Sequence, residues 1–169
     1  MNEMNRDKSM PDFSHSLPML MMRGRESVMR FFRPSLRAHD VTEQQWRVLR
    51  ALSYAGDCEV TELARITFLL APSLTRILRD LQTRGLVHRL AHVNDRRRGI
   101  VSITEDGRAL IAAVMPESES GYEQIGKRFG TKRLMALQRM LLKLEDALTT
   151  DDEKIDRGSN QRSKNASKS

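Results

Sequence analysis

The sequence predicts a mainly helical α+β fold with one small β-hairpin, and three observations predict it. Apolar residues recur at helical spacing through most of residues 17–149. The period changes to two only between Gly85 and Thr104, and Gly or Pro residues separate the segments. Because 169 residues are enough for one sizeable core and few for two, we expect a single domain over residues 17–149.

The first helix is expected within residues 17–37. Leu20, Val28 and Phe31 lie near helical spacing, and arginines occupy the rest of the cylinder. Pro34 is expected to bend or end this helix. The flanking ends of the chain, residues 1–16 and 150–169, are polar without an apolar period, and we expect both to be disordered tails.

A second helix is expected over residues 42–55. Thr42 followed by Gln45 matches a capping box, and Trp46, Leu49 and further apolar residues then recur until Gly56. The sequence therefore specifies both the start and the end of this helix.

Two shorter helices then meet across a tight turn. The first covers residues 60–66, and the second covers residues 72–84, with Pro72 at its start and Gly85 as its stop. Apolar residues hold one face of the second helix. Its polar residues face solvent or a ligand and are Ser73, Thr75, Arg76 and Arg79.

Residues 86–91 and 99–104 alternate as two short strands of a hairpin. The expected tip, residues 92–98, contains Asp95 and the three consecutive arginines Arg96, Arg97 and Arg98. The hairpin therefore presents a cluster of positive charge.

The C-terminal part of the domain is expected to contain two helices. A long helical region begins near Thr104 and contains Pro116 and Gly121, where a kink is expected. In the last helix, leucines alternate at steps of three and four and form an a/d seam: Leu134, Leu137, Leu141, Leu144 and Leu148. An intramolecular core could cover this seam, but together with the apolar first helix it favours a homodimer.

The charge distribution indicates a polyanionic partner. Twenty-nine Lys and Arg against 22 Asp and Glu give a net charge of +7, and +5 of this falls between residues 71 and 98. All cations from residue 9 to 126 are arginines, which suit bidentate contacts to phosphates and base edges. No charge-free stretch approaches the ~20 residues of a membrane span. With Cys58 as the single cysteine, no intrachain disulfide forms, and we expect a cytoplasmic protein.

The order of elements is that of a winged helix-turn-helix: a helix pair, then a hairpin with a basic tip. We expect the polar face of residues 72–84 to enter the major groove of double-stranded DNA, where an arginine can bond bidentately to guanine. Arg96, Arg97 and Arg98 would meet phosphates or the minor groove.

Several motifs resemble the MarR family of transcriptional regulators. The segment from Asp95 to Arg97 is similar to the family's Asp-x-Arg wing, and residues 102–107 are similar to its Leu-Thr-x-x-Gly motif, with Ile103 in place of Leu. Residues 72–76 and 81–87 are similar to the recognition helix and its exit, although Ala71 stands where a Ser or Asp cap is common. Residues 31–34 and 42–47 resemble the branch that regulates the breakdown of homoprotocatechuate and related aromatic acids.

The resemblance implies an obligate homodimer with N- and C-terminal dimerisation helices, which reads a palindromic operator through two winged lobes, each about residues 58–104. It implies that Asp95 positions Arg97 for the minor groove. It also implies a repressor released by a small aromatic carboxylic acid. Such a ligand needs a cation and an aromatic wall, and the candidates are Arg25, Arg33, His39, Trp46 and Arg47, with Arg25 preferred.

Other functions remain as alternatives. The chain could be a sequence-tolerant architectural DNA-binding protein, a regulator that senses oxidants through Cys58, or an enzyme or metabolite-binding module whose basic patch serves an anionic substrate. Its four histidines and Cys58 have no metal-ligand spacing, and no nucleophile elbow or phosphate loop occurs. We therefore expect no enzymatic activity, metal or cofactor.

Overall fold

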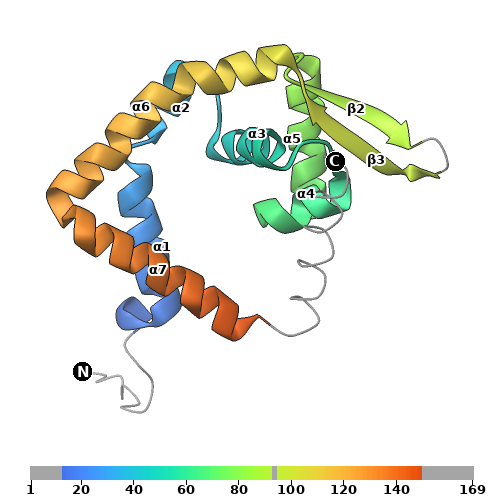
Figure 1. Cartoon of the computed structure of the whole chain (residues 1–169). Helices are drawn as coiled ribbons and strands as arrows, with labels where there is room; N and C mark the ends of the chain where they lie inside the picture. The colour runs from blue at the N-terminus through green and yellow to red at the C-terminus, as the bar shows by residue number, and fades with distance from the viewer. Residues whose placement is uncertain (1–12, 93–94, 150–169) are drawn as a thin grey trace, which may run out of the picture. The chain divides into compact units, whose positions relative to one another are not determined.

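Figure 1 shows a computed structural model of the chain, which describes residues 13–92 and 95–149 and, except for residues 90–98, their side chains. These residues form seven α-helices, a short 3-10 helix and a three-stranded antiparallel sheet, as the sequence predicts for the fold class. They divide into two compact units, Met1–Gln124 and Ile125–Ser169, and the boundary lies within one long helix. Each unit is described by itself below.

The N-terminal helical region consists of two helices, α1 (Leu17–Met29) and α2 (Arg33–Ala38), where the sequence predicts one helix that bends or ends near Pro34. Pro34 is in the first turn of α2. Inside a continuous helix, a proline ring would clash with the carbonyl group four residues earlier, so the helix breaks before Pro34 rather than at it. The 3-10 helix Phe13–His15 precedes α1, within the segment expected to be a disordered tail.

Helix α3 (Glu43–Ala55) begins at the predicted capping box. The Thr42 hydroxyl accepts a hydrogen bond from the Gln45 N–H, and the Gln45 side chain accepts one from the Thr42 N–H. Leu49 and Leu52 of this helix are fully buried in the main core. The capping box therefore fixes where α3 starts and which face it buries.

The predicted helix pair is α4 (Val60–Thr67) and α5 (Ala71–Thr83). Phe68 closes α4 in the left-handed conformation, and Leu70 is the N-cap of α5 without a side-chain cap. The cap position therefore falls at Leu70, not at Ala71. Gly85, with φ of 71°, provides the left-handed residue that ends α5.

The sheet has the strand order β1-β3-β2 and includes one strand that the sequence did not reveal. Strands β2 (Val87–His92) and β3 (Asp95–Ile103) form the hairpin, which extends away from α4 and α5 in Figure 1. Strand β1 (Cys58–Glu59) pairs with the other edge of β3. Two residues are too few to show a period of two, so their pairing depends on the tertiary fold.

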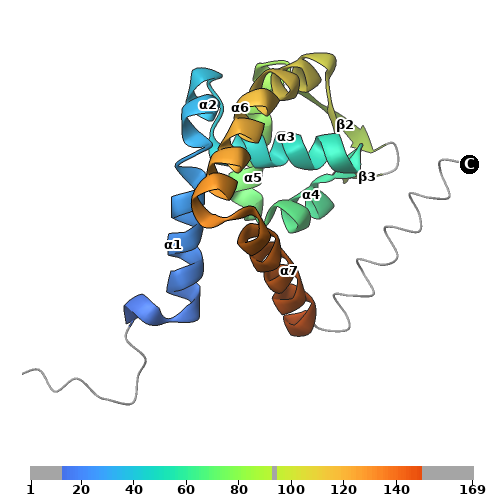
Figure 2. The ribbon, with the colours of Figure 1, turned by 60° about the vertical axis from the view of Figure 1, so that its left-hand side comes forward.

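The expected loop 92–98 is shorter in the structure, because pairing continues to His92 and Asp95 across a β-bulge. Asp95, Arg96, Arg97 and Arg98 therefore belong to β3. Strand pairing uses backbone groups, so charged side chains do not prevent it. Figure 2 shows the same lobe from another side, with the hairpin near one end of α3, which contacts β3.

The junction between the hairpin and α6 (Glu105–Phe129) explains the Thr-x-x-Gly motif. The Thr104 hydroxyl donates to the Gly85 carbonyl at 2.7 Å and accepts from the Gly107 N–H at 3.0 Å. A Cβ at Gly107 would lie 2.3 Å from the Leu86 carbonyl oxygen, so this position requires glycine. In this motif, Thr104 therefore caps the start of α6, and Gly107 allows α6 to approach the backbone of Leu86 closely.

Helix α6 continues through Pro116 and past Gly121 without interruption. Gly121 is buried, and its missing side chain leaves room for the Phe32 ring, which makes an edge contact with Tyr122 at 5.0 Å between centroids. This contact joins the middle of α6 to the segment between α1 and α2.

The second unit contains the end of α6 and α7 (Thr131–Leu148). None of the described α7 residues is buried. The predicted leucine seam is present as a helix, but Leu137, Leu141 and Leu148 remain exposed.

Candidate nucleic-acid interface and adjoining cavity

The polar face of α5 presents the residues that the sequence selected for base contacts. Thr75, Arg76 and Arg79 are exposed, and Ser73 is half-buried. The Thr75 hydroxyl donates to the Ala71 carbonyl at 2.9 Å, within its own helix. Within the described part of the chain, Arg76 and Arg79 form no ion pair, so both guanidinium groups are available to a ligand.

The hairpin adds the second group of candidates. Asp95, Arg96, Arg97 and Arg98 lie on β3, but their side chains are outside the described residues, and the expected Asp95–Arg97 pairing stays a prediction. The side chain of Arg89 on β2 crosses to the neighbouring strand β3, where its guanidinium group lies next to Gly99. The absence of a side chain at Gly99 provides the space that Arg89 occupies.

A cavity of about 740 Å³ lies beside α5. Its walls come from α1, α2, the start of α3 and the middle of α5, all in the first unit. The residues that line it are Arg25, Glu26, Arg33, Thr42, Glu43, Gln44, Gln45, Arg47, Arg76, Ile77 and Asp80. The cavity therefore shares a helix with the proposed DNA surface.

Two of the predicted ligand residues, Arg25 and Arg33, are in a closed network of ion pairs. Arg25 contacts Glu26 at 2.9 Å and Glu43 at 2.5 Å. Arg33 contacts the same two carboxylates at 2.6 and 2.5 Å. Two cations and two anions cancel, so this part of the wall has no net charge to attract an acid.

The network shifts the acid–base properties of its members. Hydrogen bonds to Glu26 and Glu43 raise the pKa of Arg33. Burial acts to raise the pKa of Glu43, but hydrogen bonds from Arg33 and Arg25 and their charges outweigh it and hold the pKa below its ordinary value. The network therefore stabilises the fold only while Glu43 is ionised.

We expect Glu43→Gln to reduce the free energy of unfolding at pH 7 by about 0.5–1 kcal/mol, since the pairs are partly exposed. The folded pKa of Glu43 is lower than the unfolded one, so its stabilisation is complete above the unfolded pKa, about 4.3, and is lost as pH falls through the folded value. Urea unfolding at pH 7 and pH 3 checks this. An equal loss at both values would contradict it.

The cavity contains two further arginines without carboxylate partners among the described residues. Arg47 donates to the Thr67 carbonyl at 3.0 Å and is half-buried. Arg76 has no such bond. Arg47 and Arg76 are therefore lining arginines without an ion pair among the described residues, whereas Arg25, the residue that the sequence favoured, is paired.

His39 and Trp46 do not line this cavity. The His39 ring is hydrogen-bonded through Nδ1 to the Ser35 carbonyl at 2.9 Å. Trp46 packs against both hydrophobic clusters, and the Arg50 guanidinium lies 5.8 Å from its ring centroid. Both side chains therefore make contacts that belong to the fold: a hydrogen bond for His39, and apolar packing and a cation–π contact for Trp46.

The cavity residues that the sequence did not select are mainly acids and amides: Glu26, Glu43, Gln44, Gln45 and Asp80. The bonds of Glu43 to Arg25 and of Gln45 to Asp80 join residues 18 and 35 positions apart, so only the tertiary structure shows them. One signal was present for Gln45, because the capping box placed it at the start of α3.

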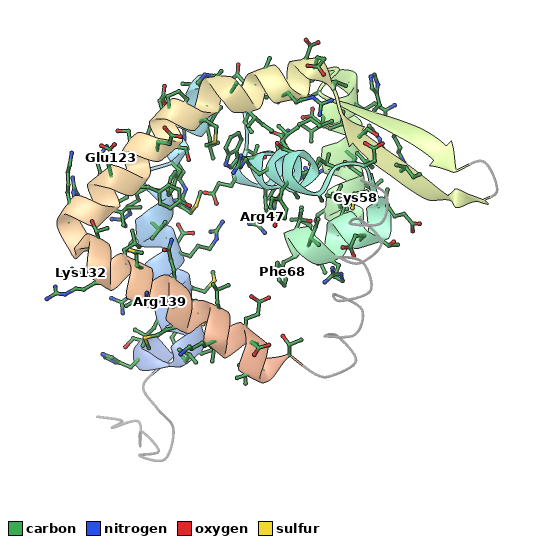
Figure 3. All side chains as sticks on the ribbon, in the orientation of Figure 1. Arg47, Cys58, Phe68, Glu123, Lys132 and Arg139 are labelled. Atoms are coloured by element: carbon green, nitrogen blue, oxygen red, sulfur yellow. The ribbon has the colours of Figure 1, made fainter. Side chains whose placement is uncertain are left out.

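Cys58, labelled in Figure 3, is 5% exposed and packs in the main core, and its thiol is near the Glu59 carbonyl at 3.4 Å. This burial favours the packed-thiol interpretation over an oxidant sensor. No cluster of metal-ligating side chains occurs among the residues that the structure describes. None of the described helices combines the length and apolar character that crossing a bilayer requires.

The sequence pattern of the MarR family matches residues 39–98. The "Homoprotocatechuate degradative operon repressor" of Escherichia coli is 36% identical over 126 residues, which are 75% of this chain and 85% of that protein. It thus resembles this chain over most of the length of both.

Two solved structures share the fold. The crystal structure of the transcriptional regulator PA4135 has a TM-score of 0.77 at 38% identity and covers 80% of this chain and 98% of its own. The structure of NadR in complex with 4-hydroxyphenylacetate has a TM-score of 0.67 at 35% identity and covers 80% and 97%. Both structures therefore share the fold over most of this chain.

Proposed function

The chain belongs to the MarR family of DNA-binding transcriptional regulators, which are not enzymes, and from this premise we propose that it is a homodimeric repressor released by an aromatic carboxylic acid. The observation that carries the proposal is the position of Arg76 and Asp80. Both belong to α5, whose outer face is suited to DNA, and both line the cavity. As a DNA-binding protein it would act in the cytoplasm.

The DNA part of the proposal places α5 in the major groove. Arg76 and Arg79 are exposed and free of carboxylates in the described chain, so neither has to leave a partner in order to bind a base or a phosphate. Ser73 and Thr75 add short polar contacts, and the arginines on β3 reach the neighbouring backbone or minor groove.

The dimer part of the proposal is supported by exposed apolar surface. In α7, Leu142 and Met140 are about two-thirds exposed, and the seam leucines are also accessible. In α1, Leu17 and Met22 are more than half exposed. Surface of this kind favours an interface with a second copy. The two lobes would then read half-sites about one helical turn apart, ~34–36 Å.

The ligand part of the proposal combines the cavity with the relatives. NadR is known in complex with 4-hydroxyphenylacetate, and the Escherichia coli relative is named as a repressor of homoprotocatechuate degradation. In this chain, Arg47 and Arg76 provide positive charge within a cavity large enough for such a molecule. An acid bound at Arg76 would also take that residue away from DNA.

The experiment is a titration of the purified full chain onto the DNA upstream of its own gene and onto a random duplex, at fixed salt, with and without 4-hydroxyphenylacetate. We expect specific binding by a dimer, verified by sedimentation, and relief by the acid. Equal affinity for both duplexes would instead indicate an architectural DNA-binding protein, and specific binding without relief would overturn the ligand class.

A further inference from the structure

We infer that Gln45 is a positioning residue that connects the cavity to the recognition helix α5 through Asp80. The inference rests on the proposed function, because it explains how occupation of the cavity changes DNA binding. It assigns a second role to a residue that the sequence marks only as a helix cap.

The Gln45 side chain is fixed at both ends of its amide. The residue is 9% exposed. Its Oε1 accepts from the Thr42 N–H at 2.8 Å, and its Nε2 donates to Asp80 Oδ2 at 2.5 Å. A carboxylate can only accept and a backbone N–H can only donate, so this orientation of the amide is the one that satisfies both partners.

Asp80 lies at a sensitive point of α5. It follows Arg76 by one helical turn and is adjacent to Arg79, and these are the two arginines that we place on DNA. Its bond from Gln45 joins the middle of α5 to the first turn of α3. Because one partner is charged, this bond is stronger than a neutral one.

A second polar tie holds the far end of α5. Arg84 Nη1 donates to the Asp40 carbonyl at 2.8 Å, just before α3. Among the described residues, no side-chain hydrogen bond of this kind holds the start of α5, and Leu70 provides no side-chain cap. Loss of the Gln45–Asp80 bond therefore leaves α5 packed by its apolar face, with its polar attachment to the α2–α3 segment at the C-terminal end. Its DNA-binding half can then change orientation without unfolding.

The bond is accessible to a ligand. Thr42, Gln45 and Asp80 all line the cavity, together with Arg76. A hydroxyl or carboxylate that enters the cavity can compete for the Gln45 amide or repel Asp80. Either event breaks the link between α3 and α5, and DNA affinity responds.

The test is an exchange of polarity across the bond. Gln45→Glu keeps the capping box, in which glutamate is a preferred residue, but places two carboxylates against each other. The double variant with Asp80→Asn restores a donor and an acceptor in reverse order. Gln44→Glu is the matched control, since the neighbouring residue also lines the cavity and receives the same charge without touching Asp80 by any described bond.

We expect Gln45→Glu to lose about tenfold in affinity for the upstream DNA while affinity for a random duplex changes little more than in Gln44→Glu. The double variant should recover most of the loss. In Gln45→Glu, 4-hydroxyphenylacetate should still bind in calorimetry but should alter DNA affinity less than it does in the wild type, because only its direct effect on Arg76 remains. Helical content by circular dichroism should be unchanged in all variants.

Equal losses in Gln45→Glu and Gln44→Glu, or no recovery in the double variant, would overturn the inference. The proposed function fails separately, through the wild type: no discrimination between duplexes removes the regulator, and no relief by the acid removes the ligand class. Hydrogen exchange of the α5 amides without DNA decides the inference in either case. Loss of the bond should speed exchange in Gln45→Glu, and the re-formed bond should return the exchange rate of the double variant to that of the wild type.

Discussion

Replacing Arg79 with alanine is expected to lower the affinity of the dimer for its operator by about 2–6 kcal/mol, at about 1–3 kcal/mol for each bidentate contact to a base. Arg79 is exposed on the polar face of α5 and has no ion pair in the described chain, so its guanidinium group is free for DNA. A binding titration with operator and random duplexes at fixed salt measures the effect.

Two variants separate recognition from charge. Arg79→Lys keeps the charge but cannot form two parallel hydrogen bonds, and it should lose specificity while retaining binding to random DNA. Arg108→Ala removes one positive charge from an exposed side chain that pairs with Glu105 on α6 and is not among the residues predicted to contact DNA. If Arg108→Ala weakened operator binding as much as Arg79→Ala, Arg79 would contribute only net charge.

The second large effect is on stability. Gly107→Ala should lower the free energy of unfolding by about 1–3 kcal/mol, because the new Cβ would lie 2.3 Å from the Leu86 carbonyl oxygen and 2.7 Å from Ile103 Cγ1. The same movement would disturb the hydrogen bond from the Thr104 N–H to the Leu86 carbonyl. Urea unfolding of the full chain measures the change.

Helix propensity alone would predict the opposite result, an increase in the free energy of unfolding for Gly107→Ala. Alanine is favoured over glycine inside a helix by about 1 kcal/mol, so Ala109→Gly, at an exposed position of the same helix, should be destabilising by that amount. If Gly107→Ala were stabilising instead, the close approach between α6 and Leu86, the residue before β2, would have to tolerate a side chain.

The local elements were predictable because their signals are local. The capping box at Thr42 and Gln45 and the stop at Gly85 set the bounds of α3 and α5 to within one or two residues. Apolar periodicity likewise identified the buried face of α5. The family resemblance rested on short motifs, and the comparisons confirmed it.

Pairings between distant residues were not predictable in this way. Strand β1 is two residues long, and its identity depends on β3. The extension of the hairpin to Asp95 depends on a bulge, and the break after Met29 depends on how Pro34 enters α2. In each case, a tertiary or backbone constraint decided the strand pairing or the helix boundary, which the local sequence pattern does not specify.

The same division applies to the site. The sequence alone determined that the chain has a basic helix-turn-helix face with Arg76 and Arg79 on it, because charge and helical period are properties of neighbouring residues. The tertiary structure decided which cations are free. Arg25 and Arg33 are neutralised by Glu26 and Glu43, whereas Arg47 and Arg76 form no ion pair with any side chain that the structure describes. Apart from the adjacent pair Arg25–Glu26, these ion pairs join residues 7 to 18 positions apart, and only folding sets the distances between them.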